Sequence, residues 1–483
     1  MLLALVVKVA GLTVAGPLSL LGLLLLSGWL PWLAEVSGAR YWRWRQRGLI
    51  WALVNLTALI WLPLGWCGYL ATLQVSLRLP AAFQNALFMS RYQWLPVVSV
   101  LWLGLWGYSL KWLPALWQQL HRPTSWRGYW RQGWQTAWWP VVRRFIRYSW
   151  VVVAAVILAS GWLAVTWLVE SWWPAAGFGM LIIAMTGLQV ATWCALSWCW
   201  HRGWPQLPRT SIWGRVVLLI AAISFAGWWG RPGPGHVAAV IAHRGVNGND
   251  GVQNTTSALK QTVRTTAPAM VEMDIQPTAD NHWVVMHDPN LQALAGRSGA
   301  VADYRLNQLS GLSLRENGRR GQLSPFSDYA TVAKRLRQPL LIEIKAVANA
   351  EQLTGAFIAR YGHQIRQRGS AVHSLDYRII MAAKRRDARV RVGFVTPFYL
   401  TDFSHSVADF YSLQGLTASR EQVNAAHRAG KPVYFWTVDR LVDQQRLTVL
   451  GADGLITNRS GQVPAISSHY YFYQLLNWCL AWL

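Results

Sequence analysis

Acidic residues are nearly absent from the first half of this 483-residue sequence. Residues 1–231 contain two of them, Glu35 and Glu170, beside 18 lysines and arginines and 29 of the 33 tryptophans. Because soluble domains carry roughly 25% charged residues, this composition excludes an ordinary soluble domain. A soluble all-α core would have to bury helices that are apolar on every side. We therefore predict a multi-span membrane domain of about six helices over residues 1–231.

Cysteine is missing from residues 232–467, which excludes a disulfide framework there. The net charge of +25 would suit a nucleic-acid partner. Most of the excess lies in loops between apolar segments of the first half, so we predict no nucleic-acid binding. The second half has 27 basic and 18 acidic residues, a milder excess that suits an anionic substrate or surface.

Long apolar runs divide the first half. A bilayer core requires about 20 apolar residues per helix, and the candidate segments are Ala10–Leu33, Leu49–Leu73, Leu95–Leu116, Trp150–Trp172, Gly177–Trp200 and Ile212–Trp229. Arginines are concentrated in the first, third and fifth connecting loops, which places these loops in the cytoplasm. The chain after the sixth segment is then outside. We therefore expect a multi-pass protein of the cell membrane with an extracellular C-terminal domain.

Tryptophans and arginines alternate at roughly helical spacing over residues 124–148. Indole rings favour the headgroup region and guanidinium groups favour lipid phosphates, so this pattern predicts an interfacial helix in contact with membrane lipids. An ordinary cytoplasmic loop with a basic bias is the alternative.

The second half has a different pattern. A Gly/Pro linker at residues 232–237 is followed by short β-like runs that alternate with helical stretches over residues 238–467. About eight such alternations predict a (β/α)8, or TIM, barrel. A doubly wound open sheet is less favoured because no GxGxxG follows the first run. The aromatic, apolar tail at residues 468–483 either caps the barrel or touches the membrane surface.

The predicted elements of the barrel can be given by range. The expected strands are Ala238–Ala242, Val271–Ile275, Trp283–Met286, Leu340–Ile344, Ala371–Ser374, Val390–Val395, Pro432–Thr437 and Gly454–Ile456. The expected helices are Thr256–Thr265, Ser327–Arg335, Ala350–Tyr361, Tyr377–Lys384, Arg420–Ala429 and Leu441–Leu450.

Carboxylates recur at the ends of these strands. Glu272 and Asp274 share one strand face, as do Glu343 and Lys345, because side chains at i and i+2 point the same way. In a barrel these groups converge on one mouth. Three carboxylates do not all stay ionised there without a cation, and oxygen ligands favour Ca²⁺ or Mg²⁺. Pairing with nearby arginines is the alternative for one isolated ExD.

Two histidines close neighbouring apolar runs. His243 and His287 suit general acid and base roles beside a metal. Arg244 and Lys345 would hold phosphate oxygens. The remaining histidines of the second half, including His373, are interpreted as surface or structural residues.

Taken in order, these motifs resemble the glycerophosphodiester phosphodiesterase family. HRG at 243–245, ExD at 272–274, HD at 287–288 and ExK at 343–345 carry the resemblance, together with HSLD at 373–376, WTVD at 436–439 and GADGLITN at 451–458. The hydrophobic half resembles the membrane domain that precedes this enzyme in some Gram-positive bacteria. Both matches together suggest the membrane-anchored form of the family.

The resemblance implies a TIM barrel with a small insertion, here within Pro289–Gln322. It implies a divalent cation at Glu272, Asp274 and Glu343, acid/base roles for the two histidines, and release of a glycerol phosphate and an alcohol. Deacylated lipid headgroups, lysophospholipids and polyglycerolphosphate polymer are the expected substrates. Supporting roles are expected for Asn254 and Trp436.

One departure stands out from the family's pattern. Gln253-Asn254-Thr255 stands where the family has Glu-Asn-Thr. An amide could still brace the loop, but it could not set the charge near a metal. A catalytically weak barrel that binds lipid headgroups or glycerophosphate polymer is therefore the alternative function.

Overall fold

The computed structural model describes residues 80–121, 125–184, 237–397, 403–462 and 469–482, with a few isolated positions besides. The chain divides into two compact units. One comprises Met1–Arg78, Ser90–Pro232 and Ser468–Leu483, and the other comprises Leu79–Met89 and Gly233–Ser467. The four predicted apolar segments Ala10–Leu33, Leu49–Leu73, Gly177–Trp200 and Ile212–Trp229 lie wholly or mostly outside the described residues.

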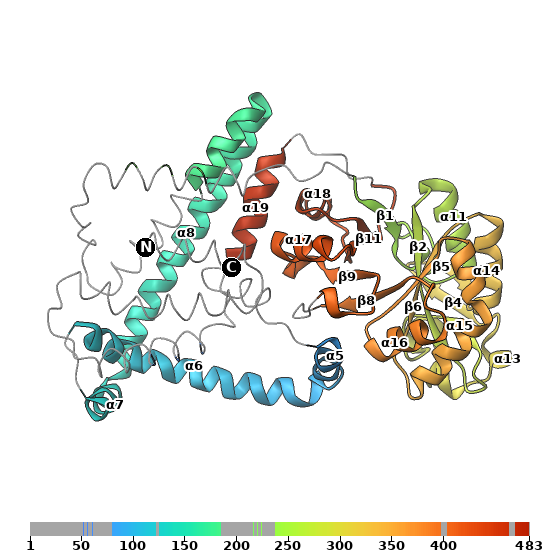
Figure 1. Ribbon diagram of the computed structural model, residues 1–483, viewed down its shortest axis with the longest axis horizontal. Helices are drawn as coiled ribbons and strands as arrows, with labels where there is room; N and C mark the ends of the chain where they lie inside the picture. The colour runs from blue at the N-terminus through green and yellow to red at the C-terminus, as the bar shows by residue number, and fades with distance from the viewer. Residues whose placement is uncertain are drawn as a thin grey trace. The chain divides into compact units, whose positions relative to one another are not determined.

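The second unit is built on a closed parallel barrel (Figure 1). Its order is β1-β2-β6-β7-β8-β9-β10-β11, and β1 pairs with both β11 and β2, which closes the sheet. The strands are β1 (Ala239–Ala242), β2 (Met270–Pro277), β6 (Leu340–Ile344), β7 (Ala371–Ser374), β8 (Val392–Thr396), β9 (Phe410–Gln414), β10 (Val433–Trp436) and β11 (Gly454–Thr457). The (β/α)8 prediction is confirmed for this part of the chain.

Helices follow the strands on the outside of the barrel. They are α11 (Thr256–Thr266), α14 (Phe326–Arg335), α15 (Ala350–Gln367), α16 (Tyr377–Arg386), α17 (Arg420–Arg428) and α18 (Leu441–Leu450), with short 3-10 turns η3 (His243–Gly245), η5 (Phe403–His405) and η6 (Gly415–Thr417). Side-chain caps begin several of them, since Thr255, Asp376 and Ser419 each accept a backbone N–H of the first turn. Their apolar faces pack on the sheet around Met273, Ile342 and Phe394.

Two strand predictions need correction. The run Trp283–Met286 is a strand, β3 (Trp283–Val285), but it pairs antiparallel with β2 and is not one of the eight barrel strands. The eighth barrel strand is β9, which we did not predict. Its sequence, FYSLQ, lies between the turn-forming residues Asp409 and Gly415, so a signal for this strand was present in the sequence.

The predicted insertion lies between β3 and α14. It contains α12 (Gln292–Ala295), η4 (Val301–Asp303), α13 (Leu306–Leu309) and a hairpin of β4 (Ser313–Glu316) and β5 (Arg319–Gln322). It has a small apolar core of its own that includes Leu291, Leu309 and Leu314. The insertion is therefore a packed element and carries Glu316 at the end of its first strand.

One helix of the barrel unit comes from far upstream. Helix α5 (Ala81–Met89) packs on α16, and its polar side chains Gln84 and Asn85 are buried there. This short segment lies between the second and third apolar segments of the sequence, yet it belongs to the same compact unit as the barrel.

The first unit contains α6 (Arg91–His121), α7 (Trp126–Gln135), α8 (Trp138–Trp172) and α19 (Tyr470–Trp482). Among the described residues, no helix has the combination of length and apolarity that a bilayer crossing requires. The single interfacial helix predicted for residues 124–148 is wrong in its bounds, because the backbone leaves the helix at Thr136 and a new helix begins at Trp138.

The C-terminal tail forms α19 and packs on α8 of the first unit. The carboxylate of Glu170 accepts hydrogen bonds from the backbone N–H groups of Tyr471 and Phe472, at distances of 2.8 and 2.9 Å. One of the two acids in the first 231 residues therefore caps the N-terminus of the last helix.

Candidate active site

The candidate site lies next to a layer of apolar side chains in the interior of the barrel. Side chains from six strands form one apolar cluster in the barrel, namely Ile241, Leu341, Ala371, Phe410, Tyr434 and Ile456. Because alternate residues of a strand point to the same side, the residue two positions further along each strand also points inward. These residues are His243, Glu343, His373, Ser412, Trp436 and Asn458. The polar layer lies toward the carboxyl ends of the strands, where barrel enzymes build their sites.

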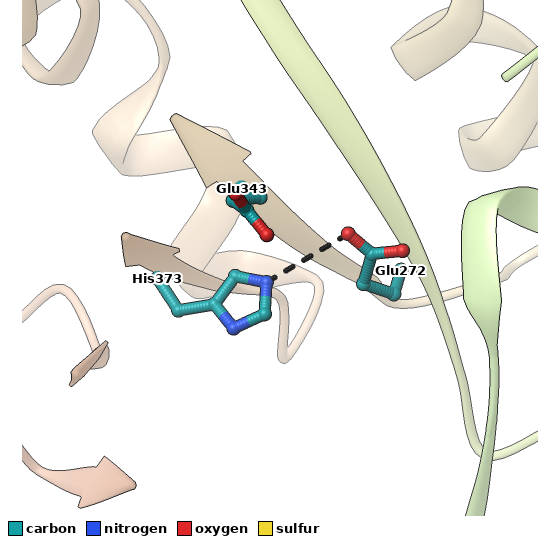
Figure 2. Close-up of side chains that lie close together, drawn as sticks. All are labelled: Glu272, Glu343 and His373. Atoms are coloured by element: carbon teal, nitrogen blue, oxygen red, sulfur yellow. Dashed lines mark ion pairs between the residues drawn. The ribbon is translucent and has the colours of Figure 1, made fainter. Parts of the chain in front are cut away.

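Three side chains of this region could together hold one metal ion. One ligand atom each of Glu272, Glu343 and His373 lies within 4.8 Å of the others, and Figure 2 shows the three side chains converging from β2, β6 and β7. The Nε2 atom of His373 lies 3.9 Å from Oε1 of Glu272. We call these residues the acidic–histidine group.

The chemistry of His373 fits a ligand. Its side chain is 2% exposed, and its Nδ1 lies 3.1 Å from the hydroxyl oxygen of Ser412. Its Nε2 is buried with no hydrogen-bond partner among the described residues. A buried imidazole nitrogen without a partner, aimed at two carboxylates, is the arrangement expected of a metal ligand.

Asp274 is held by different partners. Its carboxylate lies 2.7 Å from Nζ of Lys345 and accepts a 2.8 Å hydrogen bond from the side-chain amide of Asn254. Nε of Arg244 is 3.7 Å away. Burial raises the pKa of Asp274, but Lys345, His287 and Arg244 together lower it well below its ordinary value. We call Arg244, Asp274 and Lys345 the ion-pair group.

Lys345 links the two groups. Its ammonium lies 2.6 Å from Oε1 of Glu343 as well as 2.7 Å from Asp274. Burial lowers the pKa of Lys345, but the two carboxylates outweigh this effect and raise it above its ordinary value. The lysine therefore stays charged at neutral pH.

His243 is oriented through a chain of hydrogen bonds. Its Nδ1 lies 2.8 Å from Oδ1 of Asn458, and the amide nitrogen of Asn458 donates to Asp439 at 2.9 Å. Since the Asn458 amide donates to Asp439, its oxygen faces the imidazole and accepts from Nδ1–H. Nε2 of His243 lies 3.9 Å from Oε2 of Glu272.

His287 follows β3 at the edge of the site. Its Nδ1 lies 2.8 Å from Oδ1 of Asp288, and its side chain is 33% exposed. The two predicted acid/base histidines therefore differ in their partners: an amide orients one, and a carboxylate pairs with the other.

The loop after β1 carries the departure at Gln253. Its side-chain oxygen accepts from Arg244 at 2.5 Å, and its side-chain nitrogen donates to Glu316 at 2.6 Å. Glu316 also accepts from the backbone N–H of Gln253 at 2.9 Å. The insertion thus brings a carboxylate beside the position where a glutamate was expected.

Most predicted site residues come together here. The sequence did not identify His373, Ser412, Asn458 and Glu316 as site residues. His373 is buried, so of the two interpretations that the sequence left for it, the surface one is wrong. The first three share a signal in the sequence, since each stands two residues after a large or apolar residue of the interior layer. Asp274, a predicted ligand, lies outside the acidic–histidine group. Trp436 lines the interior layer and donates from Nε1 to the backbone oxygen of Ser412 at 3.0 Å.

Several known proteins are similar to this chain. Residues 243–462 match the sequence model of the "Glycerophosphoryl diester phosphodiesterase family". A glycerophosphodiester phosphodiesterase of Caldanaerobacter subterraneus is 26% identical over 231 residues, covering 45% of this chain and 93% of that protein. Glycerophosphodiester phosphodiesterase 1 of Bos taurus is 31% identical over 152 residues, covering 30% of this chain and 45% of that protein. A phosphodiesterase of Oleispira antarctica, solved with sn-glycerol-3-phosphate, aligns with 18% identity and a TM-score of 0.42, covering 47% of this chain and 94% of that structure.

Proposed function

We propose that the polar layer of the barrel cleaves glycerophosphodiesters by paired histidine catalysis, because residues 243–462 match the glycerophosphoryl diester phosphodiesterase family model. The observation that carries the proposal is the convergence of His243, Lys345 and the acidic–histidine group around the carboxylates of Glu272 and Glu343. Products are a glycerol phosphate and an alcohol.

His243 acts as the general base. The Asn458–Asp439 pair keeps a proton on Nδ1 of His243 and leaves the Nε2 lone pair facing the site. A neutral imidazole held in this tautomer accepts the proton of the nucleophile. Either a substrate hydroxyl or a water serves as that nucleophile.

His287 acts as the general acid. Asp288 carries the charge that complements an imidazolium, and the 2.8 Å contact fixes the ring. The protonated ring delivers its proton to the leaving alkoxide. This assignment gives the two histidines opposite roles because their hydrogen-bond partners differ.

Lys345 and Arg244 bind the phosphate. An ammonium carries three donors, and the contacts to Asp274 and Glu343 use two of them. Nε of Arg244 is buried and has no hydrogen-bond partner among the described residues. Both cations can therefore hold the non-bridging phosphate oxygens as charge develops on them.

Glu272, Glu343 and His373 would hold a divalent cation. Two carboxylates and an unpartnered imidazole nitrogen fit such an ion. The resemblance to the family favours Ca²⁺ or Mg²⁺. When bound, a divalent cation neutralises charge on the phosphate and its nucleophile.

We also propose that the first half attaches the enzyme to a membrane. Helices α6 and α8 expose large apolar side chains, such as Val100, Leu101, Ile157 and Leu158, and an exposed apolar surface of this kind is typical of contact with lipid or protein. With the positive-inside arrangement of the arginines, the barrel is extracellular. Lysophospholipids or polyglycerolphosphate polymer are then the substrates nearest to the site, and deacylated lipid headgroups are a third class.

The second candidate function is a weak barrel that binds such molecules without cleaving them. Gln253 is the observation that favours it. Full-length protein assayed for glycerol phosphate release from glycerophosphocholine distinguishes the two functions. We expect release that chelation and His287→Ala each abolish. Activity that survives either treatment contradicts the mechanism, and binding without release supports the second function.

Sidedness has its own test. A cysteine at the exposed barrel position Arg389 should react with an impermeant maleimide on intact cells. Protection from the reagent would place the barrel in the cytoplasm.

A further inference from the structure

Helix α5 is fastened to the barrel by buried polar groups. The side-chain amide of Asn85 donates to Asp376 at 3.3 Å, and its oxygen accepts from the backbone N–H of Tyr377 at 2.9 Å. Gln84, its neighbour, donates to the hydroxyl of Thr396 at 3.0 Å. Asn85 and Gln84 are 5% and 6% exposed. Since a buried amide without hydrogen-bond partners destabilises the folded state, these contacts specify where the helix docks.

The contacts lie at the same end of the barrel as the active site. Thr396 is the last residue of β8, and Asp376 follows β7 by two residues. Asp376 is also the N-cap of α16, and it accepts from the backbone N–H of Arg378. Asn85 therefore completes the cap of the helix that follows β7.

A hydrogen-bond path leads from Asn85 to the site. The backbone N–H of Asp376 donates to the hydroxyl of Ser374 at 3.1 Å, and this hydroxyl donates to the backbone oxygen of Ile344 at 2.7 Å. Ser374 adjoins His373, and Ile344 lies between Glu343 and Lys345. The path thus ends on the backbone beside three site residues. Asp376 and Ser374 are both fully buried, so water does not substitute for these bonds.

We propose that Asn85 is a positioning residue of the active site, and that α5 makes the N-terminal half a working part of the catalytic domain. Asn85 touches neither substrate nor metal. It fixes the turn after β7, and through Ser374 it sets the register of His373 against Glu343. Residues that orient metal ligands in this indirect way typically change metal affinity or activity by about 10–100-fold when they are removed.

The test uses full-length protein in detergent, and it rests on the proposed function for two of its readouts. Asn85→Ala is compared with Phe83→Ala, a truncation at a 52% exposed position of the same helix. We measure the dissociation constant for Mn²⁺ by titration calorimetry, kcat and KM on glycerophosphocholine, and hydrogen exchange of the backbone amides at residues 371–379. Tm is measured alongside.

We expect Asn85→Ala to weaken Mn²⁺ binding about tenfold, to lower kcat more than KM, and to speed exchange at residues 374–379. Phe83→Ala should match the wild type in all three. In a double-mutant cycle, Ser374→Ala should add little to Asn85→Ala, because both variants interrupt one path.

An Asn85→Ala protein with a lower Tm but unchanged affinity, kcat and exchange would show that α5 only stabilises the fold, and it would overturn the proposal. If the wild type neither binds Mn²⁺ nor releases glycerol phosphate, the proposed function fails instead. Hydrogen exchange then decides the positioning role alone, since unchanged exchange at residues 374–379 also overturns it.

Discussion

Glu272 and Asp274 stand two residues apart on one face of β2, yet their surroundings differ completely. The carboxylate of Asp274 faces Lys345, Arg244 and the amide of Asn254. The carboxylate of Glu272 accepts from the backbone N–H of Arg244 and otherwise faces His243, Glu343 and His373. A buried carboxylate needs compensating charge. The protein supplies that charge to Asp274 and leaves Glu272 beside groups that a metal ion would satisfy.

Within one motif, Asp274 is therefore part of an ion pair, whereas Glu272 lies in a candidate metal site. The ExD pattern alone gave both residues the same role as ligands. The difference between them comes from Lys345, which directly follows the neighbouring strand β6 and whose side chain reaches Asp274, and from His373 on β7. Substitutions at each position test the difference.

Glu272→Gln should lower kcat/KM on glycerophosphocholine roughly 10³-fold, equivalent to about 4 kcal/mol of transition-state stabilisation. The amide keeps one oxygen for the N–H of Arg244 but loses the charge that a cation requires. The melting temperature without metal should change little, because no basic side chain forms a close ion pair with Glu272 among the described contacts. Kinetics and metal-free thermal unfolding measure the two effects, and a large loss of metal-free stability would contradict this reading.

Asp274→Asn should show the reverse balance. Removing one partner of a buried ion pair leaves Lys345 undercompensated and costs about 3–5 kcal/mol of unfolding free energy. Denaturant unfolding in chelator measures this cost, with Glu272→Gln as the matched control. Equal losses of stability in the two variants would remove the distinction between the two groups.

His373→Asp should change which metal the site prefers. Imidazole ligands suit transition metals such as Co²⁺ and Zn²⁺, whereas an all-oxygen set suits Ca²⁺ and Mg²⁺. We expect the ratio of Co²⁺ to Ca²⁺ affinity to fall about tenfold, or roughly 1.4 kcal/mol. Titration calorimetry with each ion measures the ratio, and the visible spectrum of bound Co²⁺ should change with the loss of nitrogen. An unchanged ratio and spectrum would mean that His373 is not a ligand.

The sequence predicted the barrel and most of this site because both depend on short-range patterns. The motifs HRG, ExD and ExK each follow or overlap an apolar run in the sequence. Because alternate residues of a strand point to the same side, their side chains are expected at one end of the barrel. The site residues that the sequence did not identify depend on contacts between distant parts of the chain. His373 comes beside Glu343 only because β7 pairs with β6. Asn458 reaches the site through its hydrogen bond to His243, which is far away in the sequence. Helix α5, about 290 residues from its partners, could not have been assigned to the barrel from sequence.

A smaller effect than those at Glu272 and Asp274 concerns the loop after β1, which contacts both the site and the insertion. Gln253 accepts from Arg244 and donates to Glu316 with one amide, so it connects a site cation to a carboxylate of the β4–β5 hairpin. The carboxylate that the family pattern places at position 253 is thus present close by, on a different residue. This arrangement argues against the weak-barrel function, because the negative charge near Arg244 is displaced and not lost.

Gln253→Glu should therefore lower activity, although it restores the family's residue. It would set a carboxylate against Glu316 and remove the amide donor, and we expect a loss of roughly tenfold in kcat/KM, or about 1.4 kcal/mol. Adding Glu316→Gln restores one charge and one amide in exchanged positions, so the double variant should recover to within about twofold of the wild type. Kinetics of the wild type, both single variants and the double variant form the complete cycle. A Gln253→Glu variant as active as the wild type, with no gain from the second change, would show that Glu316 does not replace the missing glutamate.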